Sequence, residues 1–133
     1  MTAAERHRLV AELMRDEWHQ IPLDFEWTPA VVAEVDRLHR AGEDHAVPDP
    51  SAHFAAFALD LLRHAEGGTA DDAGDVSLIA DVLRRRFSDA TPDLVEDVRR
   101  RSRAGSDSFA ADSAVEGYAL FGLRLLTHYR ARR

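Results

Sequence analysis

The sequence predicts an all-α domain of six helices, arranged as two pseudo-symmetric three-helix repeats with the third helix of each repeat at the centre. Three observations predict this architecture: one long segment of the chain is repeated, each repeat carries the same helix start and stop signals, and the last segment of each repeat is apolar around most of a helix. Self-similarity at a fixed spacing is typical of a fold built from repeated units.

The repeat covers most of the chain, and its two copies correspond position by position. Leu9–Arg15 is matched by Leu78–Arg84, Thr28–Asp44 by Thr91–Asp107, and Phe54–His64 by Tyr118–His128. We therefore expect a single domain over residues 1–133, with repeat 1 at 1–66 and repeat 2 at 70–133.

The first helix of each repeat is predicted from the periodicity of its apolar residues. Residues 3–19 carry such a stripe, formed by Leu9, Val10, Leu13 and Met14. The corresponding helix of repeat 2 is expected over residues 74–87, directly after a joint at 67–75 that is rich in glycine and aspartate.

The second helices have the clearest boundaries. Thr28 and Thr91 are each followed by proline, and threonine before a first-turn proline is typical of a helix N-terminus. Gly42 and Gly105 stand where a glycine in left-handed conformation ends a helix. These signals predict helices over 29–41 and 92–104.

The third helices are apolar on nearly all sides, and such helices are buried. Small residues recur in them at matched positions, Ala58 in one copy and Gly122 in the other, so the two helices are expected to approach closely. Asp60 and Arg124 are also matched and are expected to pair there. The alternative is that the apolar surplus of the last helix forms a homodimer face.

Composition limits the chemistry that the chain can perform. Of its 133 residues, 45% are hydrophobic, none is cysteine, and all 17 basic residues are arginine. Disulfides, thiolate nucleophiles and lysine-based catalysis are therefore excluded. No apolar run is long enough to cross a membrane and the N-terminus lacks a signal-peptide pattern, so we expect a cytoplasmic protein without a membrane partner.

Charge is distributed unevenly between the repeats. Residues 1–66 hold 6 arginines and 13 acids, whereas residues 67–133 hold 11 of each, so the net charge of −7 resides in the first part. An acidic surface attracts a cationic partner and disfavours nucleic acid. A basic protein is therefore the expected partner.

One segment breaks the repeat. Repeat 1 carries six extra residues between its first and second helices, in a stretch that contains both tryptophans of the chain. Aromatic side chains ringed by polar groups are typical of binding hot spots. The candidate partner-binding residues are Trp18, His19, Asp24, Phe25, Glu26 and Trp27. The alternative is that this stretch only covers the end of the helical bundle.

A ligand pocket between the two repeats is the other candidate site. The residues expected to line it are His53, His64, Tyr118 and His128. The histidines lack the paired spacings and the carboxylates of a helical metal site, so no metal or other cofactor is predicted. No nucleophile or phosphate-loop motif is present either.

The function predicted from these observations is non-enzymatic protein binding. An acidic, cysteine-free helical protein suits an inhibitor or immunity-type protein that binds a basic macromolecule. The alternative function is a small-ligand-binding helical domain with its pocket between the repeats, and with an enzymatic use of that pocket left open.

Overall fold

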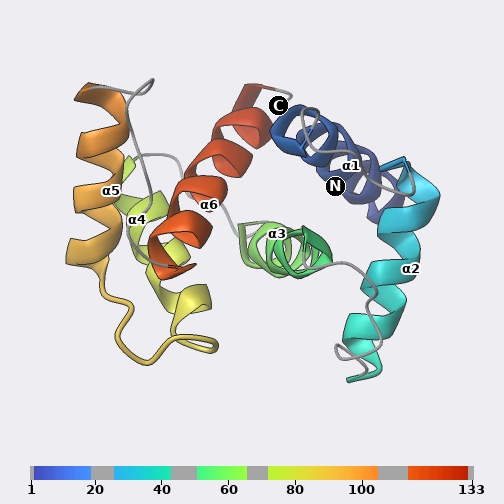
Figure 1. Cartoon of the computed structure of the whole chain (residues 1–133), viewed down its shortest axis with the longest axis horizontal. Coiled ribbons are helices and arrows are strands. Elements are labelled where there is room, and N and C mark those ends of the chain that lie inside the picture. Colours follow the sequence, from blue (N-terminus) through green and yellow to red (C-terminus); the bar gives the residue numbers. More distant parts are fainter. Residues whose placement is uncertain (1, 19–25, 43–50, 66–71, 105–113, 132–133) are drawn as a thin grey trace.

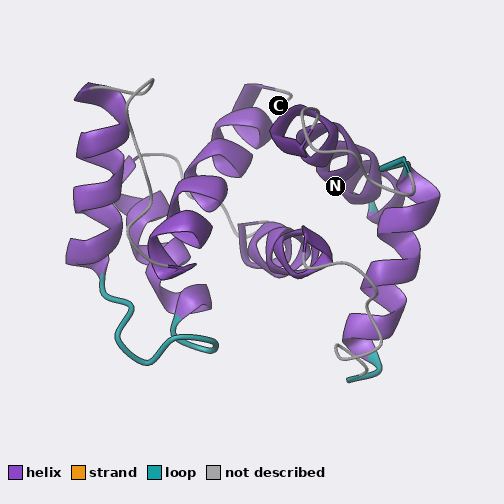
Figure 2. Cartoon of the chain, in the orientation of Figure 1, coloured by secondary structure: helices purple, strands orange, loops and turns teal. Residues whose placement is uncertain are grey.

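The computed structural model is all-helical and describes residues 2–18, 26–42, 51–65, 72–104 and 114–131. Within these ranges the chain contains no strand (Figure 2). The six helices are α1 (Ala3–Trp18), α2 (Pro29–Arg40), α3 (Ser51–Ala65), α4 (Asp72–Leu83), α5 (Pro92–Ala104) and α6 (Ala114–Ala131). None of the described helices combines the length and the apolar character needed to cross a bilayer.

The helix boundaries follow the local signals in the sequence. The Thr28 hydroxyl accepts a hydrogen bond from the Val31 amide at 3.3 Å, and Thr91 accepts one from Leu94 at 3.2 Å. After α2, Gly42 has φ +74°, the left-handed conformation that ends a helix at low cost. Gly105 lies outside the described residues.

The predicted range of α4 was wrong at its C-terminal end. The helix begins at Asp72 and ends at Leu83, whereas the expected range was 74–87. Beyond Leu83 the chain tightens, because the Arg86 amide donates to the Leu83 carbonyl at 2.9 Å, three residues back instead of four. Apolar periodicity does not distinguish such turns from a continuing helix.

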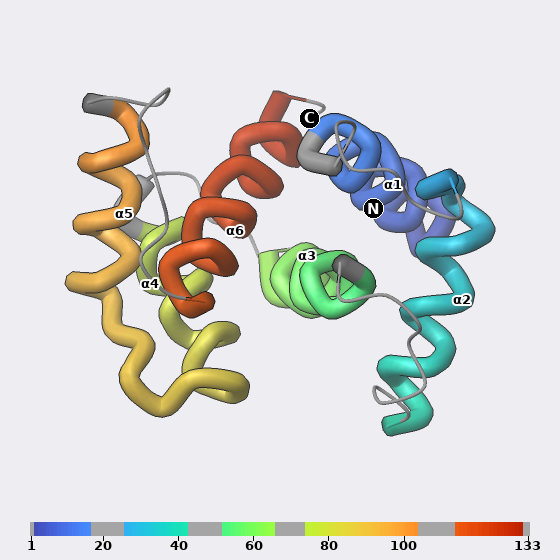
Figure 3. Tube along the Cα trace, viewed as in Figure 1, coloured from blue at the N-terminus to red at the C-terminus, as the bar shows by residue number. Residues whose placement is uncertain are grey.

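The helices form two outer pairs with α3 and α6 between them (Figure 1). The pair α1 and α2 lies at one end and the pair α4 and α5 at the other, and the Cα trace shows α6 passing over the region between α3 and α4 (Figure 3). Helix α3 contacts α1, α2, α4 and α6, while α6 contacts α5, α4, α1 and α3. These two helices therefore connect the two ends of the molecule.

Aromatic rings fill the contact between α3 and α6. Phe54 stacks on Tyr118 with ring centroids 4.2 Å apart. Phe57 meets Tyr118 edge-on at 5.4 Å, and Phe121 meets Phe54 edge-on at 5.5 Å. At Gly122 an added Cβ would lie 3.3 Å from Leu61 and 3.4 Å from Phe57, so only glycine fits here without a shift of these side chains.

Corresponding positions of the sequence repeat make corresponding contacts. Arg15 donates to the Trp27 carbonyl at 3.0 Å, and Arg84, its counterpart, donates to the Ala90 carbonyl at 3.2 Å. The helix contacts follow the same rule, since the contacts among α1, α2 and α3 recur among α4, α5 and α6, and the contact of α3 with α4 recurs as that of α6 with α1.

Candidate functional site

The residues predicted to bind a partner have different locations. His19, Asp24 and Phe25 lie outside the described residues, as does the side chain of Trp18 at the end of α1. Glu26 is exposed, whereas Trp27 is only 2% exposed and belongs to the hydrophobic core. The ring of Trp27 therefore stabilises the fold, because a surface hot spot needs an accessible side chain.

The predicted pocket between the repeats coincides with the aromatic contact of α3 and α6. Tyr118 is packed between Phe54 and Phe57, and burial raises the pKa of its hydroxyl above the ordinary value. His53 is partly exposed near the start of α3. The rings of Phe54 and Phe57 therefore pack against Tyr118 in the region where the pocket was expected.

His64 and His128, which were both expected to line this pocket, have different polar neighbours. The Nδ1 atom of His64 donates to the Asp60 carbonyl at 2.8 Å, and its Nε2 accepts from Arg85 at 3.0 Å. His128 donates from Nδ1 to the Arg124 carbonyl at 2.9 Å, and its Nε2 lies 4.0 Å from Asp16. In the described part of the chain no three metal-ligating side chains come together.

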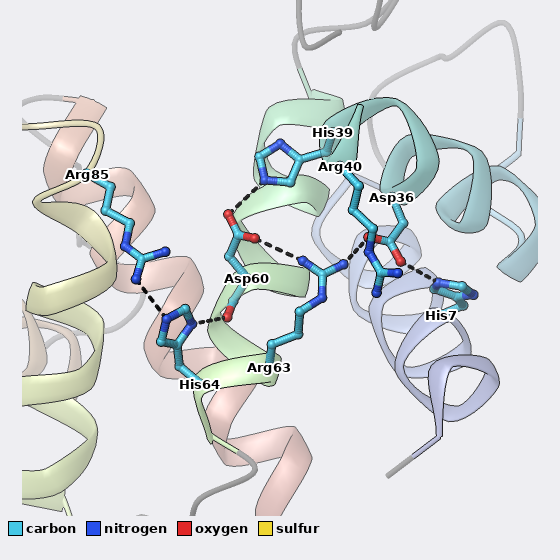
Figure 4. A network of polar contacts seen from close by, with 8 residues as sticks. All are labelled: His7, Asp36, His39, Arg40, Asp60, Arg63, His64 and Arg85. Atoms are coloured by element: carbon cyan, nitrogen blue, oxygen red, sulfur yellow. Dashed lines mark hydrogen bonds and ion pairs between the residues drawn. The ribbon is translucent and has the colours of Figure 1, made fainter. Parts of the chain in front are cut away.

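Two other polar sites are present, and neither was predicted. The first, which we call the Asp36 network, joins α1, α2 and α3 (Figure 4). The Asp36 carboxylate is 4% exposed and binds Arg63, and its Oδ2 atom lies 3.0 Å from Nε2 of His7. Arg40 approaches the same carboxylate at 3.3 Å.

Arg63 connects Asp36 to a second carboxylate. Its Nη1 atom donates to Asp60 at 3.0 Å, while its Nη2 atom donates to Asp36. Asp60 also lies 2.8 Å from Nε2 of His39, on α2. One guanidinium thus bridges two acids, and the expected pair of Asp60 with Arg124 is replaced by contacts within the first half of the chain.

The network keeps the Asp36 carboxylate charged. Burial raises the pKa of Asp36, but the hydrogen bond with His7 and the charge of Arg63 lower it by more than burial raises it. The pKa therefore lies below its ordinary value. A buried carboxylate is stable when cations and donors surround it. Two of the acids that give repeat 1 its negative charge are therefore partly neutralised inside the fold.

The second site is a pocket of about 280 Å³ on the side of α6 that faces α4 and α5. We call it the α5–α6 pocket. Its lining residues come from α4, α5 and α6: Asp75, Arg99, Ser102, Arg103, Leu120, Leu123, Arg124, Thr127, His128 and Arg130. Its size is near the lower end of the range typical of small-molecule sites, about 300–1,000 Å³.

Positive charge predominates in the α5–α6 pocket. Four arginines line it, and two carboxylates contact them, because Asp75 binds Arg130 and Glu96 binds Arg99. The hydrogen bonds from Arg99 lower the pKa of Glu96, so this acid is ionised at neutral pH. The lining is therefore rich in arginine, in a chain whose net charge is −7.

Residues of the two sites match one another in the sequence repeat. Asp36 on α2 corresponds to Arg99 on α5, and Asp60 on α3 corresponds to Arg124 on α6. Arg63, which bridges the two acids, corresponds to Thr127. Arginines thus stand where the first site has acids, and the short side chain of Thr127 stands where it has the long side chain of Arg63. Ser102 likewise stands in place of His39.

A signal for both sites was present in the sequence. The repeat matches apolar residues with apolar residues, but at these positions it matches acid with base and arginine with threonine. Aligned positions of opposite charge within a duplicated pattern indicate where the two copies differ in chemistry.

Comparison of the chain with protein-family models, with curated proteins and with solved structures gave no match. The class of protein is therefore argued from the fold and the two sites. They define a helical domain with a closed polar network at one end and an open basic pocket at the other.

Proposed function

We propose that this chain is a binding protein whose ligand is a small anion, held in the α5–α6 pocket. The observation that carries the proposal is the convergence of four arginines on one cavity of about 280 Å³. Guanidinium groups bind carboxylates and phosphates through paired hydrogen bonds, so this lining favours a ligand of negative charge.

The proposal adopts small-ligand binding and places it in a different part of the fold. In the expected location between α3 and α6, Phe54 and Phe57 pack against Tyr118. The α5–α6 pocket lies on another side of α6, and His128 is the member of the predicted set that lines it. Binding of a basic protein through residues 18–27 stays a prediction of the sequence.

We also propose that the chain arose by duplication and that its halves are related by an approximate two-fold axis. The contact of α3 with α4 and the contact of α6 with α1 support this proposal, because each helix is replaced by its counterpart. The ring contacts Phe57–Tyr118 and Phe54–Phe121 are related in the same way. In this arrangement Phe54 stacks on its own counterpart Tyr118, as residues beside a two-fold axis do.

The location of binding is tested by NMR with ¹⁵N-labelled protein and benzoate as the anion, beside benzylammonium as a cation of similar size. We expect benzoate to shift the backbone amides of Arg103, Arg124 and Thr127, and benzylammonium to leave them unchanged. Amides at the matching positions of repeat 1, such as that of Arg40, report on the first half, and their chemical shifts should not change.

A matched pair of variants provides the control. Arg103 and Arg100 are both exposed on α5, but only Arg103 lines the pocket. Arg103→Ala should weaken the shifts, and Arg100→Ala should preserve them. Equal shifts in both halves, or the same response in the two variants, would contradict the proposed function.

A further inference from the structure

The α5–α6 pocket has an apolar part as well as a basic one. Leu120 and Leu123 line it, and both side chains are half-buried against the core. They share a face of α6 with Arg124 and Thr127, because these four positions have the spacing of neighbours on a helix surface. The surface that α6 presents to the pocket therefore combines hydrocarbon with a guanidinium.

The hydroxyl and imidazole groups of the lining donate their hydrogens to their own helices. The Ser102 hydroxyl donates to a carbonyl of α5 at 2.9 Å, and the Thr127 hydroxyl donates to a carbonyl of α6 at 3.0 Å. His128 likewise donates from Nδ1 to a carbonyl of α6 at 2.9 Å. The hydrogen-bond donors that the pocket presents to a ligand are therefore mainly those of its arginines.

An arginine that contacts a carboxylate of the protein still has donors for a ligand, because one guanidinium carries five N–H groups. Arg99 contacts Glu96 and Arg130 contacts Asp75, and both arginines line the pocket. Binding of an anionic group here therefore requires no unpaired cation. It requires that arginines which already have partners in the protein share their donors with the ligand.

We propose that the α5–α6 pocket binds a small organic anion with a hydrocarbon body, its charged group beside the arginines and its body against Leu120 and Leu123. This inference rests on the proposed function and specifies its ligand class. A cavity of about 280 Å³ is much larger than a carboxylate group alone requires, since one water molecule occupies about 30 Å³ of liquid. A hydrocarbon body suits the remaining space, because it forms no hydrogen bonds and the hydroxyl hydrogens of the lining are already used.

NMR titration of the ¹⁵N-labelled protein with straight-chain carboxylates separates the charged group of the ligand from its body. From acetate to hexanoate only methylene groups are added, and we expect the dissociation constant to fall about threefold for each one, because apolar surface leaves water. Gluconate has the carboxylate and the chain length of hexanoate but carries hydroxyls, and it should bind about as weakly as acetate. Hexylammonium has an apolar body with a cation, and it should leave the amides of the pocket unchanged.

Variants separate the two parts of the pocket. Arg103→Ala should weaken acetate and hexanoate by the same factor, about three- to tenfold, because it removes donors to the charged group only. Leu123→Asn places a polar group of similar size beside the body and should reduce the gain in affinity from acetate to hexanoate by about fivefold or more. Leu120→Ala repeats this test with a smaller change.

The control for the leucine variants is Leu94→Asn. Leu94 is also half-buried but lies on α5 outside the pocket, so this variant should preserve the gain from acetate to hexanoate. Circular dichroism verifies that each variant folds.

The outcomes distinguish this inference from the proposed function. If Arg103→Ala weakens every carboxylate but acetate or gluconate binds as tightly as hexanoate, the pocket binds anions and the inference of a hydrocarbon body is overturned. The inference is also overturned if Leu123→Asn and Leu94→Asn show the same gain from acetate to hexanoate. If hexylammonium shifts the same amides as hexanoate, or if no carboxylate binds in a manner that depends on Arg103, the proposed function fails as well.

Discussion

The two ends of this molecule hold opposite chemistry at positions that match in the sequence repeat. Around α2 and α3, the carboxylates of Asp36 and Asp60 are joined by Arg63, and the site is filled by the protein's own side chains. Around α5 and α6, arginines stand in the place of the acids and the bridging residue is short, so a pocket remains. The difference teaches that sequence positions which match in a repeat can hold an ion-pair network in one half and line a basic cavity in the other, when the charge and length of their side chains differ.

Replacement of Trp27 by alanine should have the largest effect on stability. It gives repeat 1 the residue that repeat 2 has at the corresponding position, Ala90, and it leaves a cavity where a 2% exposed ring was packed. We expect a loss of about 3–5 kcal/mol in the free energy of unfolding, measured by urea denaturation. Glu26→Ala is the control, because Glu26 is the neighbouring residue and is exposed, and it should change the free energy of unfolding little.

The Trp27 result also tests the partner-binding prediction. If Trp27→Ala unfolds at the same urea concentration as the unmodified chain, the tryptophan ring is not part of the core, and a role at a contact surface regains support.

The second largest effect is expected at the centre of the Asp36 network. Asp36→Asn removes the charge that holds Arg63 and should cost about 2–3 kcal/mol at pH 6. The corresponding change in the other half, Arg99→Gln, affects a side chain that lines an open pocket. Arg99→Gln should lower the free energy of unfolding by clearly less than Asp36→Asn does. Equal losses of stability would contradict the distinction between a closed and an open site.

The cost of Asp36→Asn should depend on pH in one direction. Because the pKa of Asp36 is lowered in the folded protein, its contribution is present above the pKa of the unfolded chain, about 3.9, and is lost as the pH falls through the lower folded value. The difference between the two proteins in urea melts should therefore be constant between pH 5 and 6 and shrink at pH 3. A difference that grows in acid would contradict this assignment.

The stacked rings between α3 and α6 should show direct coupling. In a double-mutant cycle of Phe54→Ala and Tyr118→Ala, we expect an interaction free energy of about 1 kcal/mol, because offset aromatic pairs add to the burial of their surface. The same cycle with Phe54 and Leu94, which lies on α5, is the control and should give additive losses in stability. Additivity in the first cycle would show that the rings do not pack together.

The smallest effects concern the helix starts, where the two halves should behave alike. Thr28→Ala and Thr91→Ala each remove one hydrogen bond to an amide of the first turn, at 3.3 Å and 3.2 Å. Each should cost about 0.5–1 kcal/mol in urea melts. Thr→Ser at either position retains the hydroxyl and should recover most of the loss. A large difference between the two threonines would indicate that only one start is capped in solution.

Local features of the fold could be predicted from the sequence, whereas periodicity and helix signals did not predict the two sites. Thr28, Thr91 and Gly42 specify helix ends because each acts on its own turn. The Asp36 network depends on how α1, α2 and α3 pack, and periodicity carries no information about which side chains of three helices meet. The burial of Trp27 has the same origin, since an aromatic residue in a linker is equally suited to a core and to a surface.

The α5–α6 pocket is harder still to predict, because it depends on the space that the short side chains of Thr127 and Ser102 leave open. An arginine run on a helix predicts a charged face, and Arg100 with Asp97 indeed forms a pair on such a face. Only alignment of the two repeats shows that Arg99, and not Arg100, stands in the place of a buried acid. The information was in the difference between the copies.

The contacts of α6 have a consequence for how the chain is made. This helix contacts α1, α3, α4 and α5, yet it is the last of the six to leave the ribosome. Until then the apolar rings of Phe54 and Phe57 lack the partners that cover them. Domains generally fold as units during synthesis, so both halves must wait for the final helix before either is complete.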